Sequence, residues 1–139
     1  MLDAPIRAER IYAGYLAVQA VMGVVLWVTW ATSGTVRGWF ELMPERHIVM
    51  DAFVLADLGL AVVGSALAAW GIASEKTWAV PVVAFTAGTV VYPTLYLVDW
   101  VAATGSGSLC LAVMVPVATL TTWIAFQVWR TSRLVDRRR

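Results

Sequence analysis

Charged residues, cysteine and histidine are scarce in this sequence. Only 14% of the 139 residues are Asp, Glu, Lys or Arg, whereas about one-quarter of a soluble domain is charged. The single cysteine, Cys110, excludes a disulfide within the chain. One cysteine and one histidine are also too few ligands for a zinc cluster. The chain also has no glycine-rich phosphate loop and no pattern that assembles a Ser-His-Asp set. We therefore predict neither a metal site nor a bound cofactor, and we assign Cys110 no role.

Apolar residues, in contrast, dominate the chain. They make up 60% of it, and the mean hydropathy is +0.76. A single domain of this size cannot bury so much apolar surface in its own core, so a lipid bilayer must cover part of it. The net charge of +1 gives no basis for binding nucleic acid. The sequence thus predicts a membrane protein of one domain.

Four segments have the roughly 20 apolar residues that a membrane helix needs. Their approximate boundaries are 11–32, 48–73, 78–103 and 109–129. Helices satisfy their own backbone hydrogen bonds in hydrocarbon, and these segments lack the alternation of barrel strands. The predicted fold is therefore all-α, an integral membrane four-helix bundle.

Positive charges are distributed unevenly between the two sides of this predicted bundle. With four spans, both termini lie on one side. That side carries eight of the ten Lys and Arg residues, whereas the other side carries only Arg37 and Arg46. Cytoplasmic segments of membrane proteins are enriched in these residues. We predict a multi-pass protein of the plasma (inner) membrane with its N-terminus and C-terminus in the cytoplasm.

Small residues and prolines in the spans predict how the helices pack. The second span carries small residues four apart, among them Gly64 and Ala68, and this spacing lets helix backbones approach closely. The pattern fits packing within the chain and equally fits a homo-oligomer formed through the Gly64 and Ala68 face. Pro93 and Pro116 lie inside the third and fourth spans, where each removes a backbone hydrogen bond and is expected to kink its helix.

Carboxyl groups inside the spans are the strongest functional signal. Intramembrane acids are costly, and they usually face a bundle interior or a water-filled cavity. Asp57 lies about ten residues into the second span, which is about 15 Å from its outer end. Asp51 lies nearer that end, and Asp99 lies in the outer part of the third span. We take Asp57, Asp99 and Asp51 as candidate catalytic residues.

Aromatic and polar side chains from three spans are expected at the same level as these acids. On the third span, Tyr92, Tyr96 and Asp99 follow the i, i+4, i+7 spacing of one helix face, and a kink at Pro93 would widen the space beside it. We therefore predict a pocket that opens to the extracytoplasmic side. Its candidate substrate-binding residues are Trp27, Trp30, Phe53, Tyr92, Tyr96, Trp100, Gln19 and His47.

Most of these residues also have a structural interpretation. Asp51 could lie at the membrane interface and cap its helix or pair with His47 or Arg46. Asp99 could bond a tyrosine or snorkel to the outer surface. Tryptophans near span boundaries are typical of the interfacial belt. Gln19 is typical of a residue that hydrogen-bonds between helices. Asp57 is the hardest to explain in this way, because a carboxyl group at that depth has few structural uses.

Three classes of function fit this pattern. The first is a membrane-embedded enzyme of isomerase or cyclase type, which transfers a proton from a carboxylic acid to a lipophilic, isoprenoid- or lipid-like substrate. A low-dielectric site favours the neutral form of a carboxyl group, and aromatic faces stabilise the resulting cation. This chemistry resembles that of integral membrane terpene cyclases and sterol isomerases. The alternatives are a non-catalytic membrane subunit or lipid-binding scaffold, and a small proton-coupled transporter. Membrane lipid and a lipophilic small molecule are the expected partners.

Overall fold

The computed structural model describes residues 3–43 and 48–136, and it describes side chains for residues 8–43 and 50–132. Over these residues the chain is helical apart from short connections. The helical elements, among which η1 is a π-helix, are α1 (Asp3–Thr32), α2 (Gly34–Phe40), α3 (Ile48–Ala56), η1 (Asp57–Val62), α4 (Val63–Ala73), α5 (Ala79–Thr104) and α6 (Ser108–Asp136).

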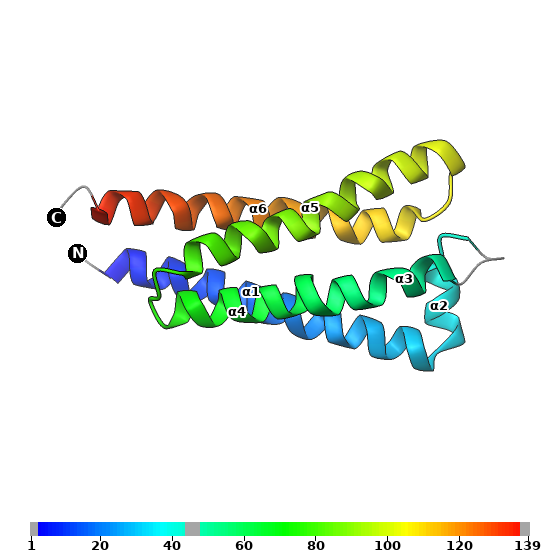
Figure 1. Cartoon of the computed structure of the whole chain (residues 1–139), viewed down its shortest axis with the longest axis horizontal. Coiled ribbons are helices and arrows are strands. Elements are labelled where there is room, and N and C mark those ends of the chain that lie inside the picture. Colours follow the sequence, from blue (N-terminus) through cyan, green and yellow to red (C-terminus); the bar gives the residue numbers. More distant parts are fainter. Residues whose placement is uncertain (1–2, 44–47, 137–139) are drawn as a thin grey trace.

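Four stretches of helix are long and apolar enough to cross a membrane: Ala8–Thr32, Met50–Ala73, Ala79–Thr104 and Ser108–Ser132. They form an all-α bundle in which neighbouring stretches run in opposite directions (Figure 1). The predicted fold class is thereby confirmed, and the four stretches indicate a multi-pass membrane protein. We call the end where α1 begins and α6 ends the terminal end, and the opposite end, which holds α2, the loop end. The cytoplasmic orientation of the terminal end stays a prediction.

Two helical hairpins make up the bundle. In the first, α1 packs against the continuous α3–η1–α4 rod, and in the second α5 packs along α6. The contact between α4 and α5 joins the hairpins in the half of the bundle near the terminal end. Towards the loop end the two hairpins diverge (Figure 1).

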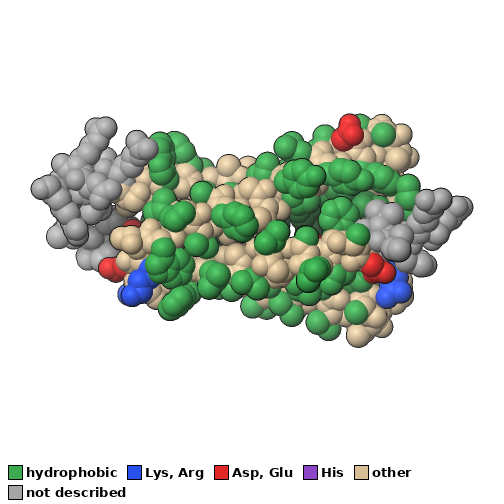
Figure 2. Space-filling view, viewed as in Figure 1, with side chains coloured by type: hydrophobic (Ala, Val, Ile, Leu, Met, Phe, Trp, Pro, Cys, Tyr) green, Lys and Arg blue, Asp and Glu red, His purple; other side chains and the backbone are tan. Residues whose placement is uncertain are grey.

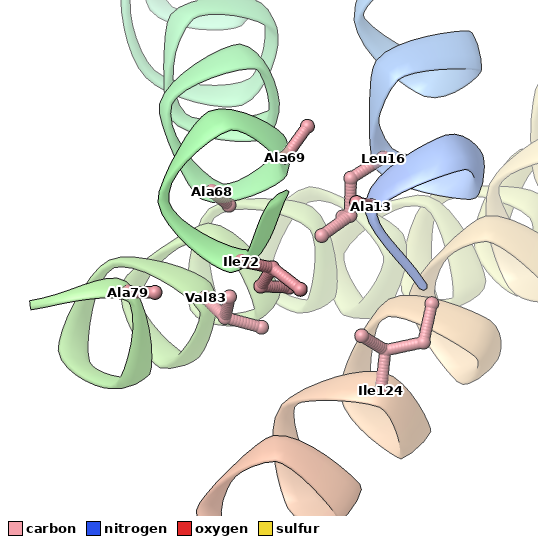
Figure 3. Packing of buried hydrophobic residues seen from close by; sticks show 8 residues of the cluster. All are labelled: Ala13, Leu16, Ala68, Ala69, Ile72, Ala79, Val83 and Ile124. Atoms are coloured by element: carbon pink, nitrogen blue, oxygen red, sulfur yellow. The ribbon is translucent and has the colours of Figure 1, made fainter. Parts of the chain in front are cut away.

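Two buried clusters hold the helices together. The larger lies in the half of the bundle near the terminal end, where small side chains allow tight packing; drawn in Figure 3, it consists of Ala13, Leu16, Ala68, Ala69, Ile72, Ala79, Val83 and Ile124. The smaller lies near the loop end and consists of Leu42, Leu97 and Cys110. A Cβ atom added to Gly64 would lie 2.8 Å from the Thr86 hydroxyl on α5. The Gly64 and Ala68 face is thus occupied within the chain, so a second copy would have to use another surface.

A hydrogen-bonded layer crosses the middle of the bundle. The Gln19 amide on α1 donates to the Ser65 hydroxyl on α4 at 3.0 Å, and the Thr121 hydroxyl on α6 donates to the Gln19 carbonyl oxygen at 2.8 Å. Both hydroxyl-bearing residues are fully buried. Buried polar groups stabilise a fold when they are paired in this way. Gln19 therefore joins three helices, as one of its two interpretations predicts.

Candidate functional site

A cavity of about 70 Å³ lies in the half of the bundle near the loop end, where the hairpins diverge. The space-filling view is hollowed between the two hairpins on this side of the molecule (Figure 2). All four membrane-length stretches and the α2 segment contribute side chains. The lining residues are Leu26, Trp27, Phe40, Leu42, Met50, Phe53, Asp57, Pro93, Leu97, Cys110, Val113 and Met114. Among these described residues, Asp57 carries the only carboxyl group, and the rest of the lining is almost wholly apolar.

Asp57 stands at a break in the regular helix geometry. It begins η1, and at the end of this π-helix the Val63 N–H bonds the Leu58 carbonyl, five residues earlier. A π turn accommodates an extra residue, so it changes the direction in which the neighbouring side chains point. Such turns are rare and often occur at functional sites. Nothing in the sequence indicated this one.

Trp27 lies beside Asp57 in the lining of the cavity. Trp27 is buried on α1, with 6% of its surface exposed, and Asp57 is partly buried. The Trp27 ring meets the ring of Trp30 edge-on, with centroids 6.2 Å apart. An indole N–H is a donor only, so Trp27 can offer a donor and no acceptor to a carboxyl group.

Asp51 lies outside the cavity, at the contact between α1 and α3. The Trp30 indole N–H donates to Asp51 Oδ1 at 3.2 Å. The Arg37 guanidinium stacks over the Trp30 ring at 5.7 Å and donates to the Trp30 carbonyl at 3.3 Å. Asp51 is exposed and has in this contact a structural use that the sequence did not predict. His47, its expected partner, lies outside the described residues.

Aromatic side chains extend from the cavity along α5. Phe53 lines the cavity, and its ring centroid lies 6.2 Å from that of Tyr96. Tyr96 in turn lies 6.1 Å from Trp100, whose indole donates to the Ser106 hydroxyl at 3.2 Å. These contacts connect α3 with α5 beside the cavity. Of the three residues, only Phe53 contributes to the lining.

The outward face of α5 differs from what the sequence led us to expect. Tyr92 is 75% exposed and Asp99 is also exposed, so neither points into the cavity. The neighbouring positions Pro93 and Leu97 line it instead. The buried stripe of α5 consists of aliphatic and threonine side chains, which pack against α4 and α6 and so turn the tyrosine face outward.

The segment that follows α2 closes the cavity towards the loop end. Leu42 is 2% exposed. A Cβ atom added to Gly107 would lie 2.6 Å from Leu42 Cδ2, so Leu42 packs directly against the Gly107 backbone. The Ser106 hydroxyl donates to the Leu42 carbonyl at 2.9 Å, and the Cys110 thiol donates to the Phe40 carbonyl at 3.1 Å. Sequence reasoning missed this closure, since contacts between an interhelical loop and two distant elements leave no periodic pattern.

A second cavity, of about 380 Å³, lies at the terminal end. Its charged residues are Glu9, Glu75 and Lys76, and it includes hydroxyl groups from α6. The mixture of acid, base and hydroxyl groups at a helix end is typical of solvated surface. Within the part of the chain that the structure describes, no three His, Cys, Asp or Glu side chains lie close enough together to hold a metal ion.

The fold and the first cavity define a class of protein: a bundle with four helices of membrane-spanning length and an apolar pocket that holds one carboxyl group. No family model matches this chain, and neither a curated protein nor a solved structure matches it. Function must therefore be argued from the residues of the pocket.

Proposed function

We propose that the protein is a membrane-embedded isomerase that moves a double bond in a lipophilic, isoprenoid- or lipid-like molecule by proton transfer at Asp57. The observation that carries this proposal is the position of Asp57 as the single carboxyl group among the described residues of an apolar cavity. Intramembrane acids of this kind are costly, and they commonly mark functional sites. Asp51 and Asp99 lie outside the cavity, so the proposal gives neither of them a part in the chemistry.

The size and lining of the cavity favour one end of an apolar chain as the ligand. A volume of about 70 Å³ exceeds what one water molecule needs and falls well short of the roughly 300–1,000 Å³ of pockets that enclose a drug-sized molecule. The closure by Leu42 separates the cavity from the loop end, whereas the hairpins diverge beside it. A substrate whose reacting end enters from the bilayer fits these features, with the remainder of its chain among the lipids.

A single carboxyl group is sufficient for a double-bond shift. In the first step the Asp57 O–H bond breaks and a C–H bond forms at one alkene carbon, which leaves a carbocation and a carboxylate. In the second step the carboxylate removes a proton from the carbon on the far side of the cationic centre, and that C–H electron pair becomes the new double bond. Asp57 then holds a proton again, so no co-reactant is consumed.

The neighbouring aromatic groups support both steps. The rings of Trp27 and Phe53 line the same cavity as Asp57, and aromatic faces attract a cation. A hydrogen bond from the Trp27 indole N–H to the Asp57 carboxylate, formed as the proton leaves, would be charge-assisted. Both effects favour the charged pair of the transition state over the neutral ground state, which is the requirement for catalysis.

The test uses the purified protein in bilayers made from the total lipid extract of its expression host, and mass spectrometry locates the double bonds. We expect a lipophilic alkene whose double bond moves in the presence of the parent protein. Asp57→Asn should slow this shift by about 10²–10⁴, the usual cost of losing a positioned acid. Asp51→Asn is the matched control and should retain the rate. No shift with the parent, or equal rates for all three proteins, would reject the proposal.

A non-catalytic subunit or lipid-binding scaffold is the second candidate. The observation in its favour is the position of Asp57 beside Trp27 of α1, since a hydrogen bond from the indole to the carboxyl group would give Asp57 a structural use between α1 and η1. Asparagine keeps an oxygen that can accept this bond but supplies no acid proton. A scaffold therefore predicts that Asp57→Asn leaves every property intact, whereas Asp57→Leu, which removes the acceptor, destabilises the bundle.

A further inference from the structure

One exposed face of α5 carries polar side chains where a membrane helix normally presents apolar ones to lipid. The exposed positions on this face follow a heptad spacing of three and four residues. They are Phe85, Gly88, Tyr92, Leu95 and Asp99, and we call them the α5 stripe. A Cβ atom on Gly88 would have no atom within 4 Å, so the chain itself leaves this face open.

One member of the α5 stripe, Tyr92, lacks a partner at a depth where water is scarce. Tyr92 lies 12 residues from the end of α5 at Thr104, about 18 Å along the axis, which is near the middle of the span. The residue is 75% exposed and makes no hydrogen bond within the described residues. A polar group at this depth usually faces protein. Asp99 also has no hydrogen bond or ion pair within the described residues, but it lies only about 7 Å inside the same end, close to the membrane interface.

The corresponding face of α1 gives the contrast. Its exposed stripe includes Val18, Val21, Val25 and Val28, all between 45% and 62% exposed. These aliphatic residues are what a lipid-facing surface requires. The two stripes have the same spacing and overlap in depth, so α1 and α5 differ at these exposed positions in composition and not in pattern.

We propose that the α5 stripe packs against the α5 stripe of a second copy of this chain. Copies inserted in the same orientation bring their α5 helices together in parallel and at equal depth. In a symmetric pair each residue near the axis faces its own counterpart. The heptad spacing suits the left-handed crossing of such helices, and Gly88 lets the two backbones approach.

The polar group in the middle of the stripe is complementary to itself. A tyrosine hydroxyl both donates and accepts, so Tyr92 hydroxyls from two copies satisfy each other. A pair of copies therefore provides a partner for Tyr92, which an aliphatic partner helix would not. Asp99 lies near the helix end, where water can separate the carboxyl groups of the two copies. The inference is independent of Asp57 and of the reaction proposed for it.

Cysteine cross-linking in native membranes tests the proposal. In a Cys110→Ser background, single substitutions Phe85→Cys, Gly88→Cys and Leu95→Cys should give disulfide-linked dimers under mild oxidation. The matched controls Val18→Cys, Val21→Cys and Val25→Cys lie on the equally exposed α1 stripe and should remain monomeric. Dimers at both stripes would mean random collision. Monomers at both, or cross-links from α5 to a different protein, would also overturn the proposal.

A second measurement tests the polar contact. Tyr92→Phe should weaken dimerisation of the otherwise native protein by about 3- to 20-fold, the loss expected for one interhelical hydrogen bond. Förster transfer between labelled copies in vesicles measures this affinity. Val21→Thr on α1 is the control and should leave it unchanged. An unchanged affinity in Tyr92→Phe would contradict the assigned contact.

Discussion

The three intramembrane aspartates have different surroundings at the level of single residues. Asp57 lines the apolar cavity beside Trp27, whereas Asp51 accepts a hydrogen bond from Trp30 on the protein surface and Asp99 faces outward. Only one of these carboxyl groups shares a cavity with apolar side chains, and this difference of location is the basis for assigning chemistry to Asp57 alone.

Cys110 offers a natural probe of access to the cavity, because it is the only cysteine and its thiol is in the lining. Leu42 closes the cavity towards the loop end. We expect Leu42→Ala to accelerate the reaction of Cys110 with a charged, water-soluble maleimide, because the smaller side chain opens a path from water. Mass spectrometry of the labelled protein gives the rate.

The control for this measurement is Leu55→Ala, which makes the same change at a side chain that is 83% exposed and does not line the cavity. Its labelling rate should equal that of the parent. If Leu42→Ala also left the rate unchanged, the segment after α2 would not be what separates the cavity from water.

The positions of the helices could be predicted from the sequence more reliably than the face that each helix buries. Hydrophobic length alone located the four long helices, because only an unbroken apolar run can cross a bilayer. The buried face of α5 differs from the one expected from the sequence. The face with the tyrosines and Asp99 was expected to point into the bundle, yet the buried stripe carries Val83, Ala87, Val90 and Thr94. Threonine bonds its own helix backbone, as Thr94 does with Val90 at 2.7 Å, so it packs like an aliphatic residue.

The π-helix η1 could not be predicted from the sequence either. Apart from Asp57, the residues of η1 up to Val62 are common in membrane helices, and no proline marks the change. The elements that pack against η1 include α1 and α5, which lie far from it in the sequence, so no local pattern accompanies the π-helix. Asp57 was nevertheless identified from sequence, because the cost of a carboxyl group in hydrocarbon does not depend on the local helix type.

At the scale of the whole molecule, the distribution of Lys and Arg predicts that the terminal end faces the cytoplasm. In a Cys110→Ser background, Gly105→Cys at the loop end should react with a membrane-impermeant maleimide added to intact cells. Thr77→Cys at the terminal end should react only after the membrane is opened. Reaction of both from outside would contradict the four-span topology, and the reverse pattern would contradict the orientation.

Orientation matters to the account because it fixes the leaflet in which the Asp57 cavity lies. The cavity is in the half of the bundle near the loop end, so the prediction places it in the outer leaflet. The packed core and the Gln19 layer occupy the rest of the bundle. A lipophilic substrate would therefore reach Asp57 from outer-leaflet lipid, and the second cavity at the terminal end would have no part in the reaction.

The most direct test of proton transfer at Asp57 is the deuterium content of the isomerised lipid. Protein whose exchangeable protons have been replaced in D₂O is mixed with the responsive lipid fraction for a single turnover. The account predicts about one deuterium in each product molecule, located at the newly protonated carbon, because the first proton delivered comes from Asp57. The Asp57→Asn protein should give none above a protein-free control, while Asp51→Asn should match the parent. Product with a shifted double bond and no deuterium, or equal deuterium with Asp57→Asn, would contradict the central claim.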